Sequence, residues 1–145
     1  MNKQEIIKQI TELLEKLVEE PKPSRFQDQG DGTILDTQTN LVWEKECRKL
    51  TWNEATRYAK NLVLGGHSDW RLPSYRDLQT LLSLDRINPA SDFPDIISNN
   101  FWSSSSYAGS PDGSWVMDFS SGTVYGANKS SNFYVRCVRG GPVAL

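Results

Sequence analysis

The hydrophobic period of the chain changes at the prolines of residues 21–23, PKP, and this change separates two parts that follow different folding rules. Before the prolines, apolar residues recur at steps of three and four, as one face of an α-helix requires. From residue 26, short alternating runs are separated by Gly, Asn and Asp, as in β-strands joined by turns. A length of 145 residues suits one domain with an appendage. We therefore expect a helix at 2–20, a linker at 21–25 and one domain at 26–141.

The N-terminal segment is predicted to be an amphipathic helix that begins at the capping pair Asn2 and Glu5 and ends at the prolines. Its apolar stripe consists of Ile6, Ile7, Ile10, Leu13, Leu14, Leu17 and Val18. Part of the stripe fits the a and d positions of a heptad and the rest widens it, so three or more helices would cover it better than two. The alternative is that the helix lies on its own domain. Because a lone helix of this length is marginal in water, we expect a homo-oligomer.

Charge and hydropathy argue against two classes of partner. The formal charge is −2 at pH 7, which lacks the basic excess of a surface that follows phosphates, so we expect no nucleic-acid partner. No run approaches the roughly 18 apolar residues of a membrane span, and the start MNKQEIIKQI does not resemble a signal peptide. We therefore expect a cytoplasmic protein, and a cell-surface or phage-particle location stays open.

The domain is predicted to contain two capped helices and several short strands. Thr51 with Glu54, and Ser74 with Asp77, have capping-box spacing ahead of apolar residues at helical steps. Alternation predicts strands at 33–35, 41–43, 115–119, 123–128 and 133–138, with a tight turn at Gly122. The acidic residues Asp28, Asp31 and Asp36 lack the spacing of an EF-hand, so we assign them to turns.

Residues 99–115, NNFWSSSSYAGSPDGSW, set aromatic rings among serines, glycines and a proline. Flexible tails lack such rings, because each ring needs a surface to cover its apolar face. Tyrosine offers contact area at a small entropic cost, and serine, asparagine and glycine adapt their hydrogen bonds, as in antibody loops. This composition favours an ordered surface that contacts a ligand.

Several stretches of the domain carry a resemblance to a known family: GDGTILDTQTNLVWEK, TWNEATRYAKNL, GGHSDWRLPSYRDLQTLL, FWSSSSY, SWVMDFSSGTVYGANKSS and YVRCVRGG. In this order they resemble the C-terminal domain family of bacterial collagen-like adhesins, from about Phe26 to Gly141. The resemblance implies an α+β, C-type-lectin-like domain with two helices and a twisted antiparallel sheet, whose ends are brought together by the first and last strands.

The same architecture is similar to that of the target proteins of diversity-generating retroelements, whose variable positions would correspond to residues 102–139 here. The resemblance implies that Trp102, Trp115, Phe119, Gly122 and the run VRCVR form the scaffold. It implies ligand contacts from Tyr107, Ser110, Asp112, Ser121, Tyr125, Asn128, Ser131, Asn132 and Phe133. We expect a recognition module for a protein or glycan ligand. The alternative is an assembly subunit that docks on one fixed protein partner.

The sequence offers weaker support for catalysis and for metal binding. The fold also resembles formylglycine-generating enzymes, whose chemistry needs a reactive cysteine pair, but the contexts of Cys47 and Cys137 predict buried, unreactive thiols. A Cys47–Cys137 disulfide stays open, and reduced thiols are expected in a reducing compartment. Lectin-like folds often bind calcium through loop carboxylates, for which Asp92, Asp95 and Asp112 are the candidates. We expect no enzyme activity and no other cofactor.

Overall fold

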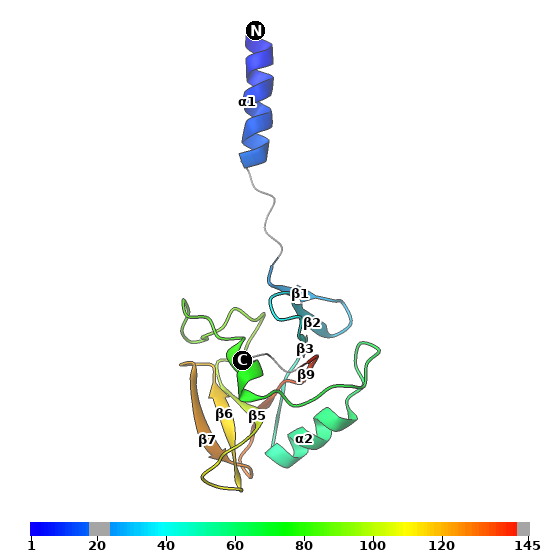
Figure 1. Cartoon of the computed structure of the whole chain (residues 1–145), viewed down its shortest axis with the longest axis vertical. Coiled ribbons are helices and arrows are strands. Elements are labelled where there is room, and N and C mark those ends of the chain that lie inside the picture. Colours follow the sequence, from blue (N-terminus) through cyan, green and yellow to red (C-terminus); the bar gives the residue numbers. More distant parts are fainter. Residues whose placement is uncertain (18–23, 142–145) are drawn as a thin grey trace.

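The computed structural model describes residues 1–17 and 24–141. The predicted N-terminal helix is present as α1, Lys3–Leu17, and the Oδ1 atom of Asn2 accepts the amide of Glu5 at 2.8 Å. Residues 18–20 of the predicted helix and 21–23 of the predicted linker lie outside the described residues. All residues of α1 are exposed, and Figure 1 shows the helix apart from the other elements. The apolar stripe from Ile6 to Leu17 is therefore not covered by the described part of the chain.

The rest of the described chain is a mixed α+β domain, as the sequence predicted. Its elements are β1 (Phe26–Asp28), β2 (Thr33–Asp36), β3 (Val42–Glu44), β4 (Arg48–Leu50), α2 (Trp52–Asn61), α3 (Tyr75–Gln79), β5 (Asn100–Ser106), β6 (Gly113–Asp118), β7 (Thr123–Asn128), β8 (Phe133–Val135) and β9 (Val138–Arg139). They form a four-stranded sheet of order β1-β2-β3-β9 and a five-stranded sheet of order β4-β8-β5-β6-β7.

Both helices of the domain begin where the capping boxes predicted. The hydroxyl of Thr51 accepts the amide of Glu54, whose carboxylate accepts the amide of Thr51 at 3.0 Å. Ser74 and Asp77 make the same reciprocal pair at the start of α3, with the carboxylate 2.9 Å from the Ser74 amide. These side chains satisfy amides that the first turn of a helix leaves without partners.

The last strand pattern is divided between the two sheets. The sequence predicted one strand over 133–138, but the chain leaves the five-stranded sheet after Val135 and joins the four-stranded sheet at Val138. The buried guanidinium of Arg136 lies at this break and donates to the carbonyl of Glu44 at 2.8 Å. The guanidinium satisfies carbonyls at the end of β3, at the point where the chain crosses between sheets.

The five-stranded sheet is not wholly antiparallel, although the resemblance implied that it would be. Strand β8 pairs antiparallel with β4 but parallel with β5, so the five-stranded sheet is mixed. The first and last strands share the four-stranded sheet, as expected, but β9 pairs with β3, whereas β1 pairs with β2 at the opposite edge. The turn at Gly122 is confirmed: its φ is +78°, and its amide donates to the carbonyl of Asp118 at 2.7 Å.

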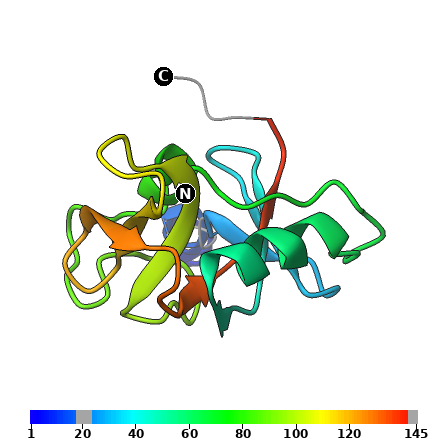
Figure 2. The same cartoon turned by 90° about the horizontal axis from the view of Figure 1, so that it is seen from below.

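The centre of the five-stranded sheet is buried on both sides. Phe101 and Met117 are paired in register and pack with Leu78 of α3, on a side that we call the α3 face. The adjacent pair, Trp102 and Val116, packs with Ala55 on the opposite side, which we call the α2 face. Because successive side chains of a strand alternate between faces, one pair of strands supplies both cores. Figures 1 and 2 show α2 and the β5–β7 strands in different parts of the domain, with β7 outermost.

All three acidic residues assigned to turns make turn contacts, and the carboxylate of Asp36 accepts the amide of Gln38 at 3.0 Å. The carboxylate of Asp28 accepts the amide of Gly30 at 2.9 Å, and that of Asp31 accepts the amide of Thr33 at 3.1 Å. Asp36 does more, because its buried carboxylate also pairs with Arg25 at 2.8 Å. Hydrogen bonds of this kind keep buried carboxylates ionised and fix the turn between β2 and β3.

Candidate binding surface

The nine ligand-contact residues expected from the sequence fall into separate groups. They all lie in or beside the β5–β8 part of the domain: Tyr107, Ser110 and Asp112 follow β5, Ser121 is in the β6–β7 turn, Tyr125 and Asn128 are in β7, Ser131 and Asn132 precede β8, and Phe133 begins it. Six of them are exposed, whereas Ser110, Ser131 and Phe133 are half-buried. The structure brings some of them together and separates others by the thickness of the sheet.

Tyr107 lies on the α3 face, in a seat made by two glycines. Its ring contacts Gly126 of β7 and Gly113 of β6, and it meets the ring of Trp115 edge-on with 5.0 Å between centroids. A Cβ atom at Gly126 would lie 2.9 Å from the ring, so only glycine leaves room for it. The tyrosine side chain is nevertheless 37% exposed. The seat therefore holds a half-exposed ring in a fixed place.

Trp115, for which the resemblance implied a scaffold role, also lies at the surface beside Tyr107. The half-buried indole lines a hollow of about 330 Å³, together with Tyr75 and Gln79 of α3 and Val124 of β7. Sequence reasoning missed Tyr75 and Gln79. The capping box at Ser74 located the start of α3, but the position of that helix over β6 depends on long-range packing that no local pattern records.

Tyr125 and Phe133 lie on the opposite, α2 face. Tyr125 is opposite Val116 in register, so its side chain shares that face and is 38% exposed. Burial and the nearby carboxylate of Asp118 raise the pKa of its phenol. Phe133 packs edge-on against the buried Trp102 with 5.0 Å between centroids, so its half-buried ring is largely a packing contact. The three aromatic residues expected to face one ligand thus do not share one surface.

Two further predicted residues, Asp112 and Asn128, line a polar hollow of about 460 Å³ at the start of α2. Lys129 crosses it: its ammonium lies 4.1 Å from the centroid of the Trp52 ring and donates to the carbonyl of Pro111 at 3.1 Å. The side-chain oxygen of Asn128 accepts the amide of Ser130 at 2.8 Å. The polar side chains of Asn128 and Lys129 thus have partners within the chain. Lys129 links the β7–β8 turn to the start of α2 through its contact with Trp52.

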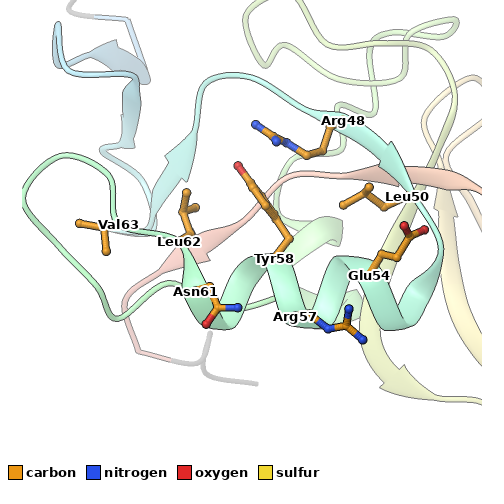
Figure 3. Close-up of a pocket in the computed structure, with 8 residues that line it drawn as sticks. All are labelled: Arg48, Leu50, Glu54, Arg57, Tyr58, Asn61, Leu62 and Val63. Carbon is orange, nitrogen blue, oxygen red and sulfur yellow. The ribbon is translucent and has the colours of Figure 1, made fainter.

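The sequence did not predict the groove between α2 and β4, which Figure 3 shows. It has about 460 Å³ and is lined by Arg48, Leu50, Glu54, Arg57, Tyr58, Asn61, Leu62 and Val63. The guanidinium of Arg48 stacks 4.1 Å from the centroid of the Tyr58 ring, and the Tyr58 hydroxyl donates to the carboxylate of Glu44. Arg57 points away from Tyr58 (Figure 3). The groove combines apolar walls with positive charge, which suits an acidic group.

A buried carboxyl group, that of Glu44, contacts the Tyr58 side chain that lines this groove. Burial raises the pKa of the Glu44 carboxyl, although Tyr58 and the Cys137 amide both donate to it, the latter at 3.1 Å. Burial and the neighbouring carboxylate also raise the pKa of the Tyr58 phenol. The hydrogen bond between the two side chains anchors α2 to β3 of the four-stranded sheet.

The cysteines and acidic residues considered for catalysis or metal binding lie in separate parts of the described domain. Cys47 and Cys137 are free, and burial raises the pKa of both thiols, which disfavours the nucleophilic thiolate. Asp92 pairs with Arg86 at 3.1 Å, and Asp112 lies in the polar hollow. Over residues 1–17 and 24–141, no three His, Cys, Asp or Glu side chains form a group that could hold a metal ion, so Asp92, Asp95 and Asp112 do not converge. No helix in the described ranges is both long enough and apolar enough to cross a membrane.

Comparison with known families agrees with the resemblance predicted from the sequence. The model of a family described as the Lcl C-terminal domain matches residues 32–139, which include both sheets' central strands and both helices of the domain. No curated protein matches the chain. The match begins after β1 and leaves α1 outside it.

Proposed function

Because the chain belongs to the Lcl C-terminal domain family, we propose that it is a recognition module that binds a protein or glycan ligand and leaves it chemically unchanged. We also propose that its α+β fold is C-type-lectin-like, which is supported by two short helices, two sheets, and the first and last strands in one sheet. Function on such a fold depends on the site that it carries rather than on the fold itself.

The observation that carries the proposal is the exposure of two aromatic rings, that of Tyr107 in the β5–β6 connection and that of Tyr125 in β7. Tyr107 and Tyr125 remain 37% and 38% exposed, although Trp102 and Val116 beside them are fully buried. The glycine seat and the edge-on contact with Trp115 hold Tyr107 without covering it. A half-exposed aromatic ring held in one position contributes contact area at little entropic cost when a ligand binds.

A non-enzymatic role is supported by the chemistry of the possible nucleophiles. Cys137 is fully buried within the core on the α2 face, and the raised pKa of its thiol keeps the sulfur protonated. Cys47 is more accessible, but burial raises the pKa of its thiol as well, despite the neighbouring Arg136. Neither thiol has the lowered pKa that a reactive cysteine requires.

We also propose that α1 joins several copies of the chain. We further propose that the ligand-facing residues of the domain differ between sister copies, as in proteins diversified by retroelements. The uncovered apolar stripe of α1, with Leu17 75% exposed, supports the first part. Clustering of copies would multiply weak single contacts into useful avidity. The second part is supported by exposure, since Tyr107, Tyr125 and Asn128 can change without disturbing the two cores.

Affinity capture with the full chain tests this function. The chain is immobilised and exposed to extract and medium from its native source, and the retained material is identified by protein mass spectrometry and monosaccharide analysis. We expect a ligand whose retention falls when Tyr107 and Tyr125 are changed together to Ala. Retention should be unchanged in the control Leu84→Ala, which alters an exposed side chain between α3 and β5. A single protein retained in fixed ratio would favour the assembly role, and retention that ignores the tyrosines would contradict the proposed surface.

A further inference from the structure

Strand β7 forms one edge of the five-stranded sheet and has a free side. Its six residues pair with β6, and no strand follows it in the sheet order. Within the described residues, the backbone of 123–127 makes no hydrogen bond except to β6. Figure 1 shows β7 as the outermost strand of its sheet. Alternate amides and carbonyls of β7 therefore point outward with no partner in the chain.

The two edges of this sheet differ in how they are protected. The opposite edge, β4, is only three residues long, contains Arg48 and Lys49, and adjoins the groove of α2. Short length and positive charge are the usual means by which proteins prevent an edge from pairing with another strand. The segment 119–128, FSSGTVYGAN, has no charged residue and no proline, and β7 has no bulge in its register with β6. This edge is therefore competent to accept a further strand.

The hollow on the α3 face gives the free edge a side-chain preference. The hollow has a volume of about 330 Å³. Val124 of β7 forms one wall, and Trp115, Tyr75 and Gln79 form the others. In a paired strand, the residue opposite Val124 points to the same face and lies about 5 Å away. A bulky apolar side chain at that position would extend over the hollow and contact the indole of Trp115.

We propose that β7 binds an extended, uncharged segment of a partner protein, which adds as a sixth strand and places a bulky apolar side chain opposite Val124. This inference rests on the proposed recognition function and specifies its ligand as a polypeptide strand. Main-chain hydrogen bonds supply affinity, and the hollow supplies selectivity. Tyr125 on the α2 face and Tyr107 over Gly126 flank the added strand on its two sides.

A second copy of the chain fits this edge less well. Two-fold antiparallel pairing of β7 with itself keeps like faces together, so the residue opposite Val124 would be Gly122, Val124, Gly126 or Asn128. None of these is large and apolar enough to fill the hollow beside Trp115. In the registers that place Gly122, Val124 or Asn128 opposite Val124, Tyr125 would also lie opposite the smaller Ser121, Thr123 or Ala127 on the other face.

A displayed library of random peptides, each long enough to pair with all six residues of β7, tests the proposal with the full chain as bait. We expect enrichment of peptides that lack charge and proline across the paired positions and carry one large apolar residue. Replacing backbone amides of an enriched peptide by N-methyl amides one at a time should abolish binding at alternate positions only, because alternate amides face β7. Binding should also slow hydrogen exchange of the outward β7 amides.

The variant Val124→Lys should weaken binding by about tenfold or more, since it places a charge beside the hollow. The control Leu84→Lys introduces the same charge at an exposed aliphatic residue between α3 and β5 and should bind normally. Thermal melting of both variants establishes that they fold. The inference would be overturned if no peptide is enriched, if N-methylation weakens binding without alternation along the peptide, or if exchange is slowed outside β7. It would also be overturned if the chain forms dimers through β7 that Val124→Lys dissociates. A ligand captured from the native source but unaffected by Val124→Lys would leave the recognition function standing and refute only strand addition.

Discussion

The substitution Gly126→Ala probes the seat that holds Tyr107. The added Cβ would lie 2.9 Å from Cγ and Cδ2 of the tyrosine ring, which are close to its own backbone and cannot move aside by a small rotation. The ring must therefore leave its seat, although the backbone of Gly126 has no positive φ and can itself accept alanine. The substitution displaces one ring without straining the strand that carries it.

The expected cost follows from two opposing effects. Loss of the edge-on contact with Trp115 removes about 0.5–1.5 kcal/mol, and partial re-exposure of the ring removes about 1 kcal/mol more. Alanine in a strand interior returns about 0.5–1 kcal/mol, because it restricts the unfolded chain. We therefore expect a net loss of about 1 kcal/mol in the free energy of unfolding, or a fall of about 0.5 M in the urea midpoint.

A double-mutant cycle with Tyr107→Ala, measured by equilibrium urea unfolding, isolates this clash. Without the ring, Gly126→Ala should become neutral or stabilising, so the two substitutions should differ from additivity by about 1–2 kcal/mol. Gly141→Ala serves as the control, because a Cβ there meets no atom within 4 Å. Equal effects of Gly126→Ala with and without the Tyr107 ring would refute the seat.

Three further substitutions or treatments test other parts of the structure. Burial alone would raise the pKa of Asp77, but the hydrogen bonds from Arg71 and Ser74 lower it overall. Asp77→Asn should therefore lower the free energy of unfolding by about 2 kcal/mol at neutral pH, and this difference should shrink as pH falls below the ordinary carboxyl range. A difference that does not change with pH would contradict this pairing. Ile10→Glu in α1 should convert an oligomer to monomers in light scattering with no change in the domain's melting temperature, and monomers in both samples would remove the role of α1. Iodoacetamide at neutral pH should modify Cys47 slowly and Cys137 only after unfolding, and rapid labelling of native Cys137 would contradict its burial.

Local patterns predicted the elements whose causes are local. The capping boxes at Thr51 and Ser74 located the starts of α2 and α3, and Gly122 located the β6–β7 turn, because each depends on residues a few positions apart. The alternation in 133–138 also assigned the faces correctly, since Val135 and Cys137 join the core on the α2 face and Val138 joins the other. Spacing along the chain is sufficient for features of this kind.

The sequence could not predict features that depend on long-range packing. The break at Arg136, which moves the chain from one sheet to the other, depends on the carbonyl of Glu44, 92 positions away. Tyr107 and Tyr125 were expected on one surface, but the register of β6 and β7 places Tyr125 with Val116 and the glycine seat places Tyr107 with Trp115. The groove of α2 was missed because Arg48 and Tyr58 come together only when β4 lies beside the helix.

We propose above all that a rigid sheet presents the β6–β7 hairpin to a ligand. The most direct test is hydrogen exchange of the full chain, measured once on the free chain and once with the partner retained in affinity capture. In the free chain, amides of β5 and β6 that pair within the sheet should exchange slowly, because the side chains of Trp102, Val116 and Met117 are fully buried. Addition of the partner should slow exchange further in β7 and around Tyr107. Fast exchange throughout β5–β7 in the free chain, or ligand protection confined to the α2 groove, would contradict the account.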